Sequence, residues 1–318
     1  MKKILSFVLL LGAGTAFAQA PWPDRVVRIV VPFAPGALTD VAARAIGAEL
    51  SEQLGQQFVV ENKGGAGGTL GTAEVAKSPA DGHTLVFTDN SYMISAGLYS
   101  KLPYDPLKDL APATLAVDAP AIMVARLELP AKSLREMLEL AKAKPRTLTF
   151  GSGGQGSSAH LATELLFNQA GVELVHVPFK GVAAALAETV GGRIDVTLSS
   201  VGGAVGHIRS GKVRPLALTG KERLAMLPEV PTFAESGFPD YDMVYRFGFL
   251  APAGTSQAIV TRLQQEVARA VAKQKVRDFL ATQGARPVAS TPAEYAQVIQ
   301  REIAMWRGVI QKAGVTVQ

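Results

Sequence analysis

The sequence predicts an α/β protein of two lobes, each a mostly parallel sheet flanked by helices. Three observations lead to this class. Short apolar, β-rich runs alternate with helical segments along most of the chain, which is typical of parallel sheets covered on both faces. Two long extended stretches, residues 111–125 and 241–250, carry no helical pattern and are able to cross between lobes. The length suffices for two domains of ordinary size.

The N-terminus has the pattern of a secretory signal peptide. Residues 1–3 (Met-Lys-Lys) are a short basic start, residues 4–13 are apolar and uncharged, and residues 16–18 (Ala-Phe-Ala) form a small-x-small cleavage pattern. The apolar stretch is too short to cross a bilayer core of about 30 Å, which argues against a membrane anchor. We expect cleavage after Ala18 and export to the periplasm, because cleavage two residues later would leave Pro21 as the N-terminus.

Composition excludes several classes of function. The chain has no Cys, so disulfides, thiolate catalysis and Cys-type zinc sites are excluded. Removal of the two signal-peptide lysines lowers the formal charge from +5 to +3, and no basic run follows. So mild a charge is not typical of a protein that follows a nucleic-acid backbone. We therefore expect no nucleic-acid partner, no metal and no cofactor.

The first group of predicted elements lies before residue 90. Strand 26–31 leads into the turn PFAPGALTD, where Thr39 and Asp40 are residues that open helices. The remaining elements here are a helix bearing Ile46, Leu50 and Leu54 at helical spacing, strand 57–60, a short helix from the glycine stretch 64–68 toward Ala76, and strand 83–88.

A second α/β set follows the first extended stretch. It comprises helices 133–144, 157–169 and 182–190, a short helix near His207, and strands 147–150, 173–177, 194–198 and 213–217. The chain ends in helix 256–273 and in a helix opened by Thr291-Pro292-Ala293-Glu294, a capping box with Pro at the first helical position. In that last helix an apolar stripe predicts packing on the first lobe: Tyr295, Val298, Ile299, Ile303, Trp306 and Ile310.

Domain boundaries follow from this order. Residues 1–18 are the signal peptide, residues 19–121 with 242–318 form lobe 1, and residues 122–241 form lobe 2. A ligand of such a hinged protein binds between the lobes, at the carboxyl ends of the strands.

The Ser/Gly loop, residues 152–158, is the strongest local motif. With Gly151 it contains G-x-G-x-x-G, but no acid follows the next strand to grip a ribose, which argues against a dinucleotide. Small residues before a helix still offer amides, the hydroxyls of Ser152, Ser157 and Ser158, and the positive end of the helix dipole. An ordinary turn with a serine cap is the alternative. We favour an anion site.

Evidence for catalysis is weak in the sequence. A near P-loop at residues 206–213 places Val213 where Ser or Thr must hold magnesium. The four histidines are scattered, and no nucleophile, base and orienting acid are adjacent. A secreted α/β hydrolase stays open as an alternative. It requires a histidine within hydrogen-bond reach of a serine in the Ser/Gly loop, and His160 is the nearest in sequence.

Nine stretches carry a family resemblance: PFAPGALTD, VVENKGGAGGTLG, ADGHTLVFTDN, LPYDPLKDL, FGSGGQGSSAHL, VHVPFKG, GGRIDV, GKVRPLALTGKERLAMLPEVPTFAESG and GFLAPAGT. They resemble, in order, successive blocks of the Bug/TctC family, the extracytoplasmic solute-binding receptors of tripartite tricarboxylate transporters. The resemblance implies a Venus-flytrap receptor that binds a small carboxylate between its lobes and delivers it to membrane permease subunits. It also implies that residues 33–39 and 152–158 hold one ligand carboxylate.

Three positions depart from the family pattern. Relatives commonly have a second glycine after Gly36, whereas here Ala37-Leu38 follows it, and Leu38 adds an apolar side chain at or near the cleft. Ser199-Ser200 stands where relatives often have an acid able to meet a ligand amino group. Arg246 replaces a frequent aromatic residue and is suited to grip a carboxylate bidentately. The alternatives for Arg246 are a solvated rim residue or a salt bridge to Asp242. These changes predict a ligand without an amino group and with two carboxylates.

The expected ligand-binding residues are Phe33, Pro35, Gly36, Ala37, Leu38, Thr39, Asn90, Ser91, Ser152, Gly154, Ser157, Ser158, His160, Phe179, Ser199, Ser200, Arg246 and Phe247. Among these, Leu38, Phe179 and Phe247, together with Tyr92, provide apolar walls for an aromatic or medium-chain diacid. We expect a monomer that captures its ligand without converting it. A ligand sensor for a membrane signalling partner stays open, since its site would be the same.

Overall fold

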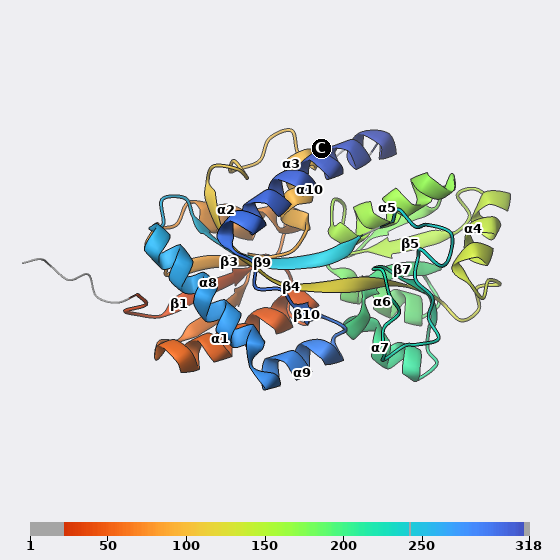
Figure 1. Cartoon of the computed structure of the whole chain (residues 1–318). Helices are drawn as coiled ribbons and strands as arrows, with labels where there is room; N and C mark the ends of the chain where they lie inside the picture. Colours follow the sequence, from red (N-terminus) through yellow and green to blue (C-terminus); the bar gives the residue numbers. More distant parts are fainter. Residues whose placement is uncertain (1–21, 242, 315–318) are drawn as a thin grey trace, which may run out of the picture.

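The computed structural model describes residues 22–241 and 243–314. Two α/β lobes lie side by side and are joined by two long strands (Figure 1). The predicted signal peptide and Asp242 lie outside the described residues. Among the helices that are described, none is long and apolar enough to span a membrane.

The first lobe contains β1 (Val27–Val31), α1 (Leu38–Leu54), β2 (Phe58–Asn62), the 3₁₀ turn η1 (Ala66–Gly68), α2 (Thr69–Ala76), β3 (Thr84–Thr88), α3 (Ser91–Leu98), α8 (Gln257–Ala272), α9 (Gln274–Thr282), β10 (Arg286–Pro287) and α10 (Pro292–Ala313). The second lobe contains α4 (Leu134–Ala143), β5 (Thr149–Ser152), α5 (Ser158–Ala170), β6 (Val175–Pro178), α6 (Val182–Val190), β7 (Val196–Ser200), α7 (Val201–Arg209) and β8 (Arg214–Leu218). The crossing strands are β4 (Leu110–Ala125) and β9 (Val244–Pro252).

The sheet is mixed, and the crossing strands are the reason. Parallel pairs form β2-β1-β3 in the first lobe and β6-β5-β7 in the second. β9 pairs antiparallel with β3 and β4, and β4 pairs antiparallel with β7 and β8. The crossing strands alone break the parallel order of the main path, β2-β1-β3-β9-β4-β7-β5-β6. The predicted two-lobed α/β class is therefore confirmed, with β4 contributing to the sheet of both lobes.

Buried apolar side chains hold the helices of the first lobe against its sheet. β1 has Ile29, Val30 and Val31 fully buried, and α1 turns Ile46 and Leu50 onto it. The predicted stripe of α10 packs against α3 and β4 and is buried apart from the half-buried Val298, and α10 also contacts α5 of the second lobe. The Thr291/Glu294 capping box is present.

Two helices were not expected from the sequence. α3 is short and apolar on nearly all sides, so it shows no amphipathic period. α9 directly follows α8, from which a single extended residue, Lys273, separates it.

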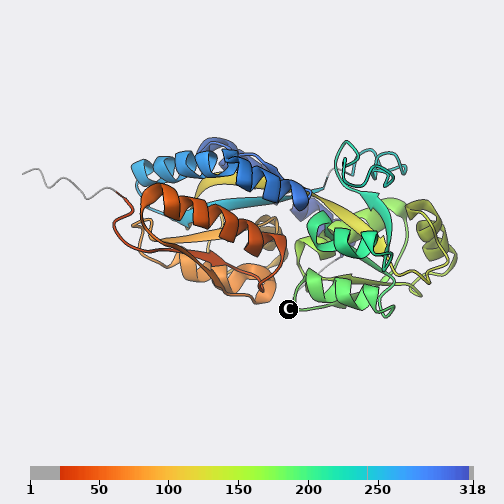
Figure 2. The same ribbon diagram turned by 90° about the horizontal axis from the view of Figure 1, so that it is seen from below.

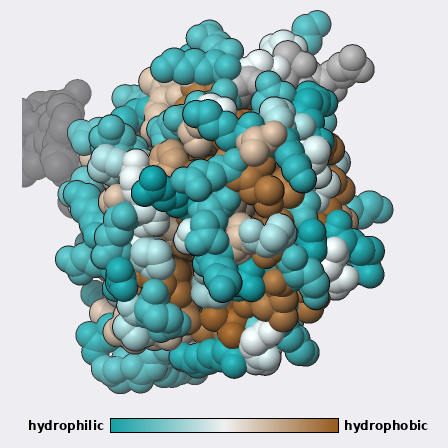
Figure 3. Space-filling view, turned by 90° about the vertical axis from the view of Figure 1, so that its right-hand side faces the viewer, coloured by the Kyte–Doolittle hydropathy of each residue, from teal (hydrophilic) through white to brown (hydrophobic). Residues whose placement is uncertain are grey.

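Other views show how the lobes are covered. From below, α1 and α8 lie side by side over the first sheet, and the crossing strands run between the lobes (Figure 2). The end of the molecule at the second lobe is hydrophilic over much of its surface, with apolar side chains gathered between the polar ones (Figure 3).

Candidate ligand site between the lobes

A cavity of about 1190 Å³ lies between the two lobes. Four segments form most of its wall: the turn after β1, the glycine loop (residues 64–68) after β2, the Ser/Gly loop after β5, and residues 179–183 after β6. Each follows the carboxyl end of a parallel strand, where open α/β sheets bind ligands. Tyr245 and Phe247 of β9 also face the cavity.

The turn after β1 is held by Asp40. Gly36 has φ +92°, and its N–H donates to Asp40 Oδ2 at 3.0 Å. Asn62 Nδ2 donates to Phe33 O at 3.1 Å and to Asp40 Oδ1 at 2.9 Å. Ala37 has an ordinary φ of −77° and precedes the first residue of α1. Alanine therefore fits here without backbone strain, and Leu38 is buried at the cavity wall.

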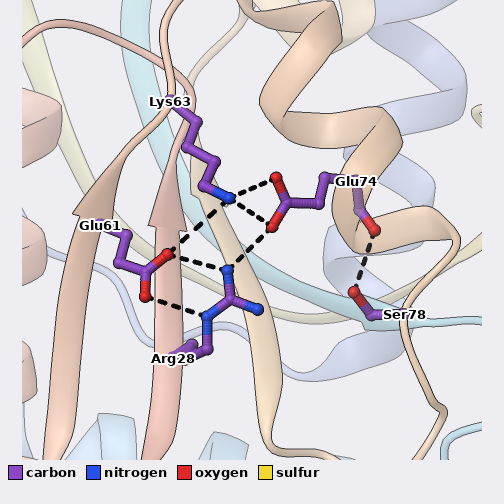
Figure 4. Close-up of polar contacts among 5 residues, drawn as sticks. All are labelled: Arg28, Glu61, Lys63, Glu74 and Ser78. Carbon is purple, nitrogen blue, oxygen red and sulfur yellow. Dashed lines mark hydrogen bonds and ion pairs between the residues drawn. The ribbon is translucent and has the colours of Figure 1, made fainter.

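The glycine loop is held by an ionic network (Figure 4). Arg28 Nε and Nη2 donate to Glu61 at 3.0 and 2.8 Å, and Nη2 also reaches Glu74 Oε1 at 2.8 Å. Lys63, which precedes the loop, donates to both oxygens of Glu74 at 2.7 and 2.6 Å. Hydrogen bonds from Lys63 and Arg28 lower the pKa of Glu74. Side chains from β1, β2 and α2 therefore hold the start of this loop.

The Ser/Gly loop leads directly into α5. Ser157 is the N-cap, and its Oγ accepts the His160 N–H at 3.3 Å. Ser157 and Ser158 both line the cavity. The first N–H groups of a helix have no partner within the helix and carry its positive dipole end. This wall is thus suited to an anion.

Two stacked histidines form hydrogen bonds with the Ser/Gly loop. The rings of His160 and His176 are 3.8 Å apart between centroids, and Phe150 stacks on His176 at 4.8 Å. Gly156 N–H donates to His160 Nδ1 at 3.1 Å, so that nitrogen carries no proton. Burial, with the neighbouring His176, lowers the pKa of His160 to about 3, and burial lowers that of His176 to about 4. Both rings are neutral near pH 7.

The stack also answers the question raised by the hydrolase alternative. Ser152 Oγ lies 2.6 Å from His176 Nε2, so the serine's partner is His176 and not His160. Ser152 is fully buried and does not line the cavity. A serine without access to substrate cannot serve as its nucleophile. We interpret this Ser–His contact as support for the loop.

The lobes meet at two serines. Ser91, the first residue of α3, places its Oγ 2.9 Å from Ser158 Oγ, the first residue of α5. Asp89 lies beside them at the end of β3, is partly buried and lines the cavity. Its Oδ1 accepts the Ser91 N–H at 2.9 Å.

Arg246 does not line the cavity. Its guanidinium forms an ion pair with buried Glu302 of α10, and its N–H donates to Asn90 Oδ1 at 2.7 Å. Asn90 Nδ2 donates to Glu302 Oε2 at 2.8 Å. A buried carboxylate requires a partner, and Arg246 supplies its charge. The arginine is therefore occupied by Glu302, and the expected grip on a second ligand carboxylate finds no support here.

The expected site residues divide into three groups. Twelve line the main cavity: Phe33, Pro35, Ala37, Leu38, Thr39, Ser91, Gly154, Ser157, Ser158, Phe179, Ser200 and Phe247. Gly36 and Ser199 line a smaller adjoining cavity of about 240 Å³, which Ser200 also lines. Asn90, Ser152, His160 and Arg246 line neither, and nor does Tyr92, which is buried against Tyr104.

Several lining residues were not predicted. The clearest are Asp89, Lys180 and the glycine loop. Asp89 and Lys180 directly follow predicted strands, 83–88 and 173–177 with its Pro-Phe extension, so position at a strand's carboxyl end was the available signal. Asp89 places an acid in the cavity although Ser199-Ser200 replaces the acid of relatives. The replacement by Ser199-Ser200 therefore does not leave the cavity without a carboxylate.

The sequence matches the tripartite tricarboxylate transporter family receptor over residues 42–315. It is 36% identical to Protein BugT of Bordetella pertussis over 310 residues, covering 97% of this chain and 95% of that protein.

Two solved structures from Rhodopseudomonas palustris are also 36% identical to this chain. Rpa4515 with adipate superposes with a TM-score of 0.88, covering 93% of this chain and 99% of that one. MatC with bound malate superposes with a TM-score of 0.85, covering 91% and 100%. This chain belongs to the Bug/TctC family of periplasmic solute-binding receptors.

Proposed function

We propose that this protein captures a small organic anion, a mono- or dicarboxylate, between its lobes and delivers it to the permease of a tripartite tricarboxylate transporter. The observation that carries this proposal is the wall of the cavity. The N-terminus of α5, with Ser157 and Ser158, faces the turn after β1 across a space large enough for such a ligand. Two relatives of this fold are described with dicarboxylates, adipate and malate.

Lys180 is the residue that we assign to a second ligand carboxylate. It lines the cavity, is exposed, and forms no ion pair with another described residue. Phe33, Phe179 and Phe247 line the same cavity and provide apolar surface for the carbon chain or ring between the two ends.

The proposed lobes are residues 19–121 with 242–318, and residues 122–241, and the ligand stabilises their closure about β4 and β9. A permease is then able to distinguish the closed, ligand-bound arrangement of the lobes from the open one. We also propose export with cleavage after Ala18, which mass spectrometry of the mature protein would test by its first residue.

The experiment is a thermal-shift screen followed by calorimetry with malate, succinate, adipate, hexanoate and benzoate. We expect at least one acid to raise the melting temperature and to bind with a stoichiometry of one. Absence of binding across the whole panel would contradict the proposal.

A further inference from the structure

Asp89 lies where the ligand carboxylate is proposed to bind. It lines the cavity, and its Oδ1 accepts the Ser91 N–H at 2.9 Å. Ser91 Oγ is in turn 2.9 Å from Ser158 Oγ, which belongs to the proposed anion wall. The Asp89 carboxylate is thus hydrogen-bonded to α3 and also to Ser158, the first residue of α5.

No basic side chain among the described residues forms an ion pair with Asp89. From β9 and α10, Tyr245 and Tyr295 face it, and burial raises the pKa of both. The charge of Asp89 adds to the rise for Tyr245, and the charges of Glu302 and then Asp89 add to it for Tyr295. Arg246 and Glu302 come from the same two elements, and they pair with each other.

Tyr99 of the first lobe lines the same cavity, and burial raises its pKa, so it carries no charge near pH 7. Two further groups belong to the second lobe. From α5, His160 has a pKa lowered to about 3 by burial and by His176, so it is neutral in the working range of pH. After β6, Lys180 lines the same cavity from an exposed position. Burial raises the pKa of Asp89 itself, although hydrogen bonds from Ser91 and Ser158 oppose the rise.

We propose that Asp89 is a ligand-contacting residue that takes up one proton when a carboxylate ligand binds, and then donates that proton in a hydrogen bond to a ligand oxygen. This inference rests on the proposed function. Two carboxylates that share a partly buried site cannot both remain ionised at low cost, so one of them acquires a proton from solvent. The acid that is neutral then serves as the donor, and the other remains the acceptor.

The consequence is binding that strengthens as the pH falls. In the range where a full proton is taken up, the dissociation constant falls by about tenfold for each pH unit. Asp89→Asn removes the titrating group but keeps an oxygen that can accept the Ser91 N–H. Asp105→Asn is a matched control, because Asp105 Oδ1 accepts the Leu107 N–H at 2.9 Å in the same local arrangement and does not line the cavity.

The test is calorimetry with the tightest binder among malate, succinate, adipate, hexanoate and benzoate. Titrations at pH 7 in phosphate and in Tris, whose ionisation enthalpies differ, count the protons taken up. For the wild type and Asp105→Asn we expect an uptake of roughly half to one proton and an affinity that rises from pH 8.5 to 6.5. For Asp89→Asn we expect no uptake, a flat pH profile, and binding at pH 8.5 at least as tight as that of the wild type.

Two results would overturn the inference alone: binding by the wild type without proton uptake, or uptake that persists in Asp89→Asn. If the wild type binds without proton uptake and also binds 2-aminoadipate more tightly than adipate, Asp89 instead accepts a hydrogen bond from a ligand amino group. If no acid of the panel binds, the proposed function fails and this inference fails with it.

Discussion

Ser91 and Ser158 lie 67 residues apart in the chain, yet their Oγ atoms are 2.9 Å apart. Each is the first residue of a helix, α3 in the first lobe and α5 in the second. Both line the cavity, so the contact between the lobes is part of the proposed site. A substitution that separates these helices should therefore weaken binding without touching the ligand.

Gly156→Ala should have that effect. A Cβ at Gly156 would lie 2.3 Å from Leu98 Cδ2, the last residue of α3, and the glycine has φ +77°. We expect a loss of about 1 kcal/mol in unfolding free energy from the backbone strain. The Leu98 side chain must also move to admit the Cβ, and because Leu98 belongs to α3 we expect weaker binding of the panel acid, as measured by calorimetry.

Gly171→Ala separates strain from clash. Gly171 caps α5 with φ +63°, and a Cβ there would meet nothing within 4 Å. We expect a similar loss of stability and an unchanged affinity. Equal losses of affinity in the two variants would show that strain in α5, and not contact between the lobes, limits binding.

Lys180→Met should distinguish diacids from monoacids. Because Lys180 is exposed, its interaction with a second carboxylate is modest, and we expect adipate to bind roughly two- to fivefold more weakly. Hexanoate, which lacks that carboxylate, should bind unchanged. Lys212→Met, at an exposed position outside the cavity, is the control. A loss shared equally by both acids would remove Lys180 from the second carboxylate position.

Arg246→Ala should act on stability. It leaves Glu302, which is 3% exposed, without its counter-charge, and we expect a loss of about 2–4 kcal/mol in urea unfolding. Arg246→Met combined with Glu302→Gln should recover much of that loss, since neither charge is then buried unpaired. A stable Arg246→Ala protein that had lost affinity for diacids alone would return Arg246 to the ligand site.

The stacked histidines predict a dependence of stability on pH. Their folded pKa values, about 3 for His160 and about 4 for His176, lie below the ordinary value near 6.5. The unfolded chain therefore binds more protons between these limits. The two neutral rings make their full contribution to the unfolding free energy above about pH 6.5. As the pH is lowered below this value, the unfolding free energy falls by up to about 1.4 kcal/mol per pH unit for each ring.

Urea unfolding between pH 7 and 5 measures this slope, and His176→Gln tests its origin. The variant should be less stable at pH 7, because Ser152 loses its hydrogen bond to the imidazole and the ring stack is lost, but its stability should fall less steeply with pH. The same slope in both proteins would assign the pH dependence to other groups.

The lobes were predictable because alternation of apolar strands with helices is a local pattern, read within each segment. Most strands, such as β1 and β5, begin within a residue or two of the expected position. The antiparallel pairing of β4 and β9 was not predictable, because direction depends on the lobe that each strand enters. α3 was missed because its residues are apolar on nearly every side.

The site was predictable only where its residues belong to recognisable loops. The turn after β1 and the pair Ser157–Ser158 each belong to a loop that follows a predicted strand, and both line the cavity as expected. Partners distant in sequence were not predictable: Glu302 is 56 residues from Arg246, and His176 is 24 residues from Ser152. Both pairings are consequences of packing. They engage Arg246 and Ser152, two residues that the sequence alone would assign to the ligand, in contacts within the protein.

The most direct test of the central claim is a crystal structure of the protein with the tightest-binding acid of the panel. We expect a ligand carboxylate between the turn after β1 and Ser157–Ser158, within hydrogen-bond distance of Asp89, and the remainder of the ligand beside Phe179 and Lys180. A ligand found outside the cavity between the lobes, or held by Arg246, would contradict this account.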